Sequence, residues 1–138
     1  MTFSAIPTPV VVDASVAFEF LNGEPRWVEA FDNWSIDDRL LMAPALFLAE
    51  VANGHLRGHG TAADEIARRL NRLVDTGVEI TDRGLPGLVE AIGLADQHGL
   101  TVYDALYLQL ALDVDANLAT LDDDLQKAAL AEGLEVVR

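Results

Sequence analysis

The sequence contains no cysteine, which excludes a disulfide framework and every reaction that needs a thiolate. It also has no apolar run approaching the roughly 18 to 20 residues of a membrane-spanning helix. The N-terminal segment lacks the basic and apolar regions of a signal peptide. We therefore expect a cytoplasmic protein that does not enter the membrane.

Basic residues are scarce, with 9 lysines and arginines against 23 aspartates and glutamates and a formal net charge of −14. Such a balance opposes non-specific binding to nucleic acid, which depends on a basic surface. It favours a basic partner, bound cations or simply high solubility.

The rest of the composition is that of a globular protein, because 51% of the 138 residues are hydrophobic. We expect one domain with one core, over residues 1–138. Apolar and β-branched segments predict strands at 10–13, 40–43, 78–81, 117–120 and 135–137. Periodic apolar segments predict helices at 16–21, 26–34, 44–57, 61–75, 85–98, 101–114 and 123–132. This alternation predicts an α/β fold whose central, mostly parallel sheet of four to five strands is covered by helices on both faces.

Four carboxylates lie either in apolar helices, where burying an acid is energetically unfavourable, or at the ends of predicted strands. Asp13 ends the first predicted strand, and Asp122 follows the strand at 117–120. Asp104 lies in the first turn of a helix that is apolar nearly all round, and Glu50 lies among apolar residues of its own helix. Ligands bind at the carboxyl ends of the strands in open α/β sheets, so we expect these acids to meet there.

Each acid also has a purely structural interpretation. Asp13 and Asp122 can cap the helices that follow them, and Asp104 can form a capping box with Thr101. Glu50 can pair with Arg57 along one helix. Four such coincidences together favour a functional cluster over four separate structural roles.

Clustered carboxylates repel one another unless some are protonated or cations neutralise them. An all-oxygen ligand set suits Mg²⁺ or Mn²⁺ rather than Zn²⁺. The histidines, His55, His59 and His98, fall at or just before glycines at helix ends. We interpret them as solvated caps. Ser15 is expected to cap the helix at 16–21, and Pro44 to begin the helix at 44–57.

Four segments resemble the motifs of PIN-domain ribonucleases and, more narrowly, of VapC, the toxin of bacterial type II toxin–antitoxin systems. They are V-V-D-A-S-V (11–16), A-E-V-A-N (49–53), Y-D-A-L-Y-L-Q-L-A (103–111) and A-T-L-D-D-D-L (119–125). The resemblance covers nearly the whole chain, in order, and the Y-D-A-x-Y-L block is its most specific part. It implies a three-layer α/β/α PIN-like sandwich.

The resemblance also implies a catalytic pocket for hydrolysis of RNA phosphodiester bonds with one or two Mg²⁺ or Mn²⁺ ions. Asp13 and Asp104 are implied as direct metal ligands, and Glu50 and Asp122 complete the acidic pocket. Residues implied as auxiliary candidates are Asp124, Ser15, Thr120 and Asn53.

The partners implied by the resemblance are RNA, a second copy of the chain in a homodimer, and a small VapB-like antitoxin. The antitoxin's C-terminal segment would lie along the toxin and place a basic side chain in the acidic pocket. Apolar candidates for such a groove, of which we expect about half to close the core instead, are Phe18, Phe20, Leu21, Trp27, Phe31 and Trp34. Candidates for RNA or partner contacts, with an ordinary solvated helix face as the alternative, are Arg57, Arg68, Arg69 and Arg72.

Two alternatives within the family stay open: a housekeeping RNA-processing nuclease and a catalytically inactive binding module. Two other α/β classes are less compatible with the sequence. A haloacid dehalogenase-type phosphatase usually has a second aspartate where Ser15 stands. Both that phosphatase and a signalling receiver domain need a lysine at the site, and the only lysine, Lys127, lies inside the last predicted helix.

Overall fold

The computed structural model describes residues 6–138 and is built around strand β1, whose three valines are almost completely buried. The five strands are ordered β3-β2-β1-β4-β5, and every pair is parallel. Their bounds are β1 (Val10–Val12), β2 (Leu41–Pro44), β3 (Glu79–Thr81), β4 (Asn117–Ala119) and β5 (Val136–Val137). A parallel sheet with β1 at its centre requires a crossover between neighbours, and the helices supply these crossovers.

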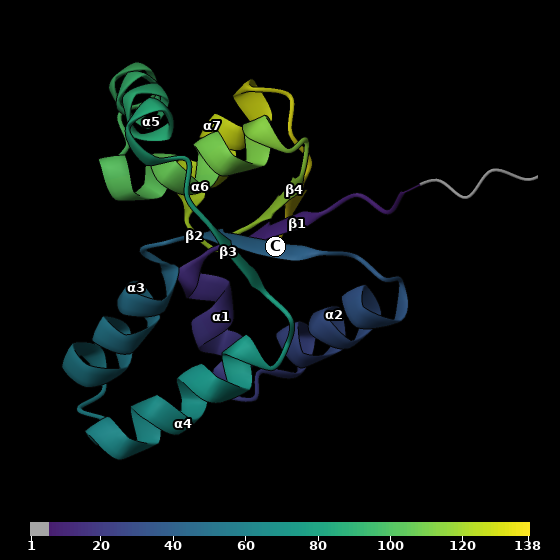
Figure 1. Cartoon of the computed structure of the whole chain (residues 1–138), viewed down its shortest axis with the longest axis vertical. Coiled ribbons are helices and arrows are strands. Elements are labelled where there is room, and N and C mark those ends of the chain that lie inside the picture. The colour runs from purple at the N-terminus through teal and green to yellow at the C-terminus, as the bar shows by residue number, and fades with distance from the viewer. Residues whose placement is uncertain (1–5) are drawn as a thin grey trace, which may run out of the picture.

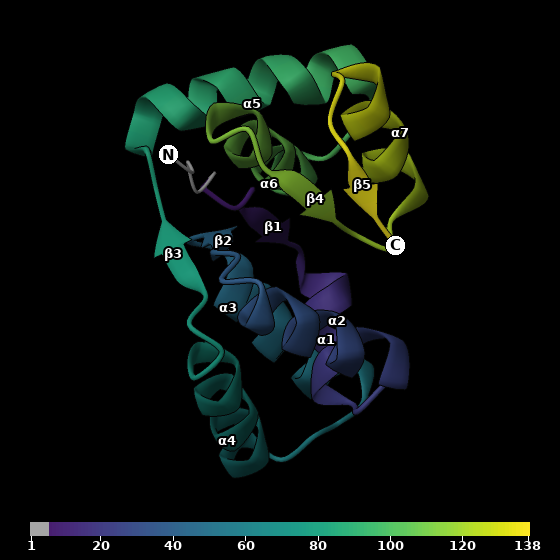
Figure 2. The same cartoon turned by 90° about the vertical axis from the view of Figure 1, so that its right-hand side faces the viewer.

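Helices cover both faces of the sheet, which confirms the predicted α/β/α sandwich (Figures 1 and 2). On one face lie α1 (Ala14–Leu21), α2 (Pro25–Ile36), α3 (Phe47–Asn53), the π-helical turn η1 (Gly54–Gly58) and α4 (Ala63–Val74). On the other lie α5 (Gly84–His98), α6 (Val102–Asp113) and α7 (Asp123–Ala131). None of the helices in the described part of the chain combines the length and the apolar character that crossing a lipid bilayer requires.

Helix α6 is buried on nearly all sides because it lies between the sheet and other helices. It contacts β1, β2 and β4 on one side and α5 and α7 on the others. This explains an apolar sequence without one polar face, since a helix enclosed in this way has little surface in contact with water. The position of α6 brings Asp104 and Tyr107 towards the ends of the central strands.

The helix predicted at 44–57 begins later than the sequence analysis expects. Pro44 is the last residue of β2, where it is paired with Thr81 and lies beyond the two residues of β2 that pair with β1. Its missing N–H therefore interrupts no pairing with the central strand. Helix α3 begins at Phe47 and continues through η1 to Gly58. The prediction that Ser15 caps the following helix is also wrong, because Asp13 is the N-cap.

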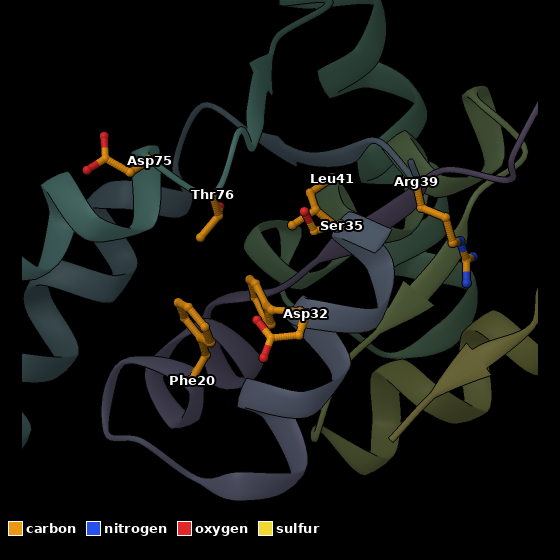
Figure 3. A pocket seen from close by; sticks show the side chains of 8 residues that line it. Phe20, Asp32, Ser35, Arg39, Leu41, Asp75 and Thr76 are labelled. Atoms are coloured by element: carbon orange, nitrogen blue, oxygen red, sulfur yellow. The ribbon is translucent and has the colours of Figure 1, made fainter. Parts of the chain in front are cut away.

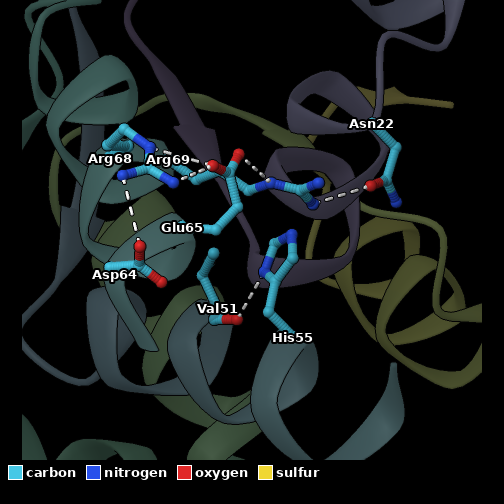
Figure 4. Close-up of polar contacts among 7 residues, drawn as sticks. All are labelled: Asn22, Val51, His55, Asp64, Glu65, Arg68 and Arg69. Atoms are coloured by element: carbon cyan, nitrogen blue, oxygen red, sulfur yellow. Dashed lines mark hydrogen bonds and ion pairs between the residues drawn. The ribbon is translucent and has the colours of Figure 1, made fainter. Parts of the chain in front are cut away.

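The interpretation of the histidines as solvated caps fails at His55, which is completely buried. Its Nδ1 lies 2.9 Å from the carbonyl oxygen of Val51 and donates to it (Figure 4). The helix continues as η1 to Gly58, and the His55 ring packs against Phe18 of α1 in the interior. His98 is half-buried and lies 2.8 Å from Glu132, whereas His59 is exposed as expected.

Candidate active site

Asp13 is held at the end of β1 by three hydrogen bonds. Its Oδ1 accepts from the backbone N–H of Val16 (3.1 Å) and from the Ser15 hydroxyl (2.6 Å). Its Oδ2 accepts a short hydrogen bond from the Thr120 hydroxyl. Burial raises the pKa of Asp13, while these hydrogen bonds act in the opposite direction. Thus Asp13 serves as a helix cap and still presents a carboxylate at the sheet edge.

Two hydroxyl groups connect the β1–α1 turn to the β4–α7 turn. The Ser15 hydroxyl accepts from the backbone N–H of Leu121 (3.1 Å), and the Thr120 hydroxyl accepts from that of Asp122 (3.0 Å). Both hydroxyls donate to Asp13 at the same time. Two turns more than 100 residues apart in sequence are therefore fixed against one carboxylate.

Asp122 and Asp124 lie at the N-terminus of α7. Asp122 is the N-cap, and its Oδ1 accepts from the backbone N–H of Leu125 (2.8 Å). Both acids are exposed. The capping interpretation is therefore correct for Asp122, and it leaves the second carboxylate oxygen free of the cap.

Asp104 lies half-buried in the first turn of α6. Its backbone N–H donates to the Thr101 hydroxyl at 3.1 Å, so Thr101 is the N-cap as the sequence predicts. Burial raises the pKa of Asp104, and the negative charges of Asp122 and Asp124 raise it further. Asp104 therefore lies in the electric field of the α7 acids.

Glu50 is held by a residue that the sequence analysis missed. The Tyr107 hydroxyl, from α6, donates a 2.6 Å hydrogen bond to Glu50 Oε1. The predicted alternative, a pair with Arg57, is not among the ion pairs of residues 6–138. Burial raises the pKa of Glu50, and the charge of Asp104 adds to this. A tyrosine hydroxyl within a buried apolar helix was the available signal, because a buried hydroxyl needs a partner.

Three of the four predicted acids are coupled through Asp104, whose charge raises the pKa values of both Asp13 and Glu50. Asp122 joins the same group through its effect on Asp104. Oxygen ligands whose mutual repulsion a cation would relieve fit Mg²⁺ or Mn²⁺ in chemical type and charge. Within residues 6–138, however, no group of three or more acidic or histidine side chains is arranged to hold a metal ion. The acids therefore fit a divalent cation in the type of ligand atom that they offer, and not in their arrangement.

The remaining predicted residues make no hydrogen bond to the four acids within residues 6–138. Asn53 and Arg57 are exposed, at the end of α3 and on η1. On α4, Arg68 pairs with Glu65 (2.8 Å) and Asp64 (3.5 Å) (Figure 4). These pairs support the interpretation of Arg68 as part of a solvated helix face.

Arg69 also contributes to packing between helices. It lies 3.3 Å from Glu65 on its own helix and donates to Asn22, after α1, at 3.2 Å (Figure 4). Arg72 is exposed on the last turn of α4. Arg69 therefore joins α4 to the end of α1.

Most of the apolar residues proposed for a partner groove close the core instead. Leu21, Trp27, Phe31 and Trp34 are buried, whereas Phe18 and Phe20 are partly exposed. Phe20 stacks on Phe31 at a ring-centroid distance of 4.0 Å. Both rings line a cavity of about 200 Å³ between α2 and the end of α4, where Asp32 is directed towards Phe20 (Figure 3).

Comparison with known proteins identifies one family. The sequence model of the PIN domain matches residues 10–130. No curated protein matches the sequence.

Solved structures match over nearly the full length. PAE2754 from Pyrobaculum aerophilum is 22% identical, with 97% of this chain and 93% of that chain covered and a TM-score of 0.69. A chain of a toxin–antitoxin complex from Klebsiella pneumoniae is 18% identical (94% and 96% covered, TM-score 0.69). VapC20 from Mycobacterium tuberculosis, described as a sarcin–ricin loop cleaving toxin, is 19% identical (94% and 98% covered, TM-score 0.69). At these identities the matches establish a shared fold.

Proposed function

The chain belongs to the PIN domain family, and from this we propose that it is a Mg²⁺- or Mn²⁺-dependent endoribonuclease that acts in the cytoplasm as the toxin of a toxin–antitoxin pair. The observation that carries the proposal is that hydrogen bonds from Ser15, Thr120 and Tyr107 fix the carboxylates of Asp13 and Glu50, and that Asp104 lies near enough to raise the pKa of both. Positioned carboxylates that lie close enough to repel one another are expected where a site binds a cation.

In this proposal Asp13 and Asp104 bind the cation directly, and Glu50 and Asp122 complete the pocket. A bound divalent cation supplies positive charge for activating water and for stabilising the charge that develops on the phosphodiester. Ser15 and Thr120 hold the Asp13 carboxylate in place through their hydrogen bonds. Tyr107 does the same for Glu50. Asp124 adds negative charge beside Asp104.

We propose a small basic antitoxin as the protein partner. The net charge of −14 favours a partner of opposite charge. The cavity between α2 and the end of α4 is lined by two stacked aromatic rings, by the acids Asp32 and Asp75 and by Arg39, and Figure 3 shows Asp32 directed towards Phe20. Such a lining suits a segment that carries both apolar and basic side chains.

A homodimer is also proposed. Its support is the exposed apolar stripe on α5 formed by Leu85, Leu88, Val89 and Ile92. None of these residues is charged, so two copies of this acidic chain would meet there with less repulsion than elsewhere. An exposed stripe of this kind is typical of an interaction surface.

The test is cleavage of total RNA by the purified protein with Mn²⁺ or Mg²⁺, with EDTA, and as Asp104→Asn. We expect the wild type to cleave RNA only when the metal is present. In Asp104→Asn, cleavage should fall by more than the roughly 10- to 100-fold that loss of a supporting residue costs. Calorimetry with Mn²⁺ on the same sample separates the alternatives. If the protein neither cleaves RNA nor binds Mn²⁺, an inactive binding module is the better description.

A further inference from the structure

A second cavity, of about 310 Å³, opens directly beside the acids. Ser15 and Glu50, which belong to the candidate active site, line it. Phe18 from α1, with Gly58 and His59 from the end of η1, also lines it. The cavity is therefore continuous with the site but is not part of the acidic group itself.

Part of the cavity lining is aromatic. The Phe18 ring packs at a tilt against the rings of His55 and His59, with ring-centroid distances of 4.3 and 5.0 Å. His55 is completely buried beneath it, so the position of Phe18 is fixed from below. Phe18 is partly exposed and His59 is exposed, so both rings are accessible from the cavity.

Two glycines keep this space open. Gly54 and Gly58 both line the cavity. A Cβ atom at Gly54 would lie 3.5 Å from the Phe18 ring, and one at Gly58 would meet no atom within 4 Å. Larger residues at these two positions would fill the space in front of the aromatic rings. The π-helical turn that carries them is an uncommon backbone form that often occurs at functional sites.

We propose that this cavity is a subsite that holds one unstacked nucleobase of a single-stranded RNA substrate, stacked on Phe18 and His59. The inference rests on the proposed function in one respect, that the substrate is RNA. Pockets for small ligands have volumes of about 300 to 1,000 Å³. The cavity is shallow and widely open, and its volume lies at the lower end of that range, which suits a flat base lying against the exposed aromatic rings.

Stacking also answers a difficulty raised by the charge of the protein. A chain with a net charge of −14 has few basic residues to hold the RNA backbone, and Arg68 and Arg69 are already paired with Glu65. Every base has a flat aromatic face, and stacking on protein aromatic rings contributes to single-strand binding without any basic residue. The subsite thus supplies affinity for RNA next to the acids, which the negative surface charge cannot supply.

The experiment measures binding in EDTA, so that it does not depend on cleavage. The probes are two fluorescein-labelled octamers, an RNA of mixed sequence and an abasic strand of the same length. Binding of each probe is measured by fluorescence anisotropy at low salt. The variants are Gly58→Leu, which fills the cavity, and Phe18→Leu, which removes the ring. Ala131→Leu is the matched control, because it adds an exposed leucine on α7, in the other helical layer.

We expect the wild type and Ala131→Leu to bind the RNA octamer at least about fivefold more tightly than the abasic octamer. Gly58→Leu and Phe18→Leu are expected to bind both probes equally weakly. Equal binding of the two probes by the wild type, or unchanged RNA binding by both cavity variants, would overturn the subsite. Cleavage of total RNA by the same wild-type sample tests the nuclease separately, so that either conclusion can fail while the other stands.

Discussion

At the scale of single residues, the Tyr107 hydroxyl is the least replaceable support of the candidate site. The ring is buried, and both burial and the negative charge of Glu50 raise the pKa of Tyr107. The hydroxyl therefore stays protonated and donates to Glu50 at any physiological pH. A positioned donor of this kind fixes the direction of a carboxylate without carrying charge itself.

We expect Tyr107→Phe to reduce RNA cleavage by about 10- to 100-fold, the usual effect of losing a residue that orients a metal ligand. The fold should lose only about 1 kcal/mol, because the buried ring stays and one hydrogen bond is lost. Cleavage assays and thermal unfolding of the same preparation measure both effects. Tyr103→Phe is the control, since Tyr103 lies one turn earlier on α6 and is 65% exposed. Equal loss of activity in both variants would show that the Glu50 contact is not responsible.

The acids of the site should destabilise the metal-free protein as pH rises. The pKa values of Asp13, Glu50 and Asp104 are all raised above their ordinary values of 3.8, 4.5 and 3.8. Between the ordinary and the raised pKa values, the folded state holds protons that the unfolded state has lost, so the free energy of unfolding falls as pH rises through this range. Glu65, whose pKa is lowered by Arg68 and Arg69, acts in the opposite direction.

Asp104→Asn removes one of these charges, so we expect it to be more stable than the wild type at pH 7 in EDTA. Because Asp104 is half-exposed, the gain should be about 1 kcal/mol, or roughly 3–5 °C in Tm. At pH 4 the difference should shrink towards zero. Thermal unfolding at both pH values measures it, with Asp96→Asn on the exposed side of α5 as the control. A lower Tm for Asp104→Asn at pH 7 would contradict repulsion among the acids.

At the scale of elements, the first turn of α5 depends on a glycine at position 87. This glycine is buried, and a Cβ atom there would lie 2.9 Å from the Arg83 Cβ and 3.5 Å from Gln109 on α6. The first distance is shorter than two carbon atoms tolerate, so the backbone must shift. Gly93, on the same helix, has no atom within 4 Å of such a Cβ.

We expect the same substitution to have opposite effects at these two glycines. Gly87→Ala should destabilise the protein by about 1–3 kcal/mol through overpacking. Gly93→Ala should stabilise it by about 0.5–1 kcal/mol, because alanine is the better residue inside a helix. Chemical denaturation of both variants measures the two values. A stabilised Gly87→Ala would show that Arg83 and the first turn of α5 can shift at little cost.

At the scale of the whole molecule, the exposed stripe on α5 decides whether the protein dimerises as proposed. We expect the wild type to sediment as a dimer and Val89→Glu as a monomer, because a charge would be buried at the contact. Leu130→Glu on α7 is the matched control, since Val89 and Leu130 are both 58% exposed. The Leu130→Glu variant should remain a dimer. A monomeric wild type at high concentration would refute the dimer, and a dimeric Val89→Glu would place the interface elsewhere.

The metal, the RNA target and the single domain over residues 1–138 stay predictions. The sequence motifs and the fold make the PIN domain assignment secure, but assignment to a family does not specify a substrate. The cleavage experiment with EDTA therefore carries more weight for function than any further likeness in structure.

The sequence by itself determined the features that depend on neighbouring residues. Strand and helix positions follow local patterns of apolar residues, and the caps at Thr101 and Asp122 follow from side chains that reach only three residues. The αL conformation of Gly99 at the end of α5 was predictable for the same reason. The four acids were likewise identifiable, because each is unusual for its own segment.

Only the tertiary structure decided how distant segments support one another. The bond from Thr120 to Asp13 joins residues 107 apart in sequence, and that from Tyr107 to Glu50 joins residues 57 apart. His55 and Pro44 were misinterpreted because glycine and proline signals describe local preferences, whereas packing against α1 and pairing with β3 overrode them. Local backbone preferences are worth about 1 kcal/mol per residue, and burial of a large side chain outweighs them. The identity of the acids is therefore encoded locally, but their orientation and the aromatic cavity beside them exist only in the folded protein.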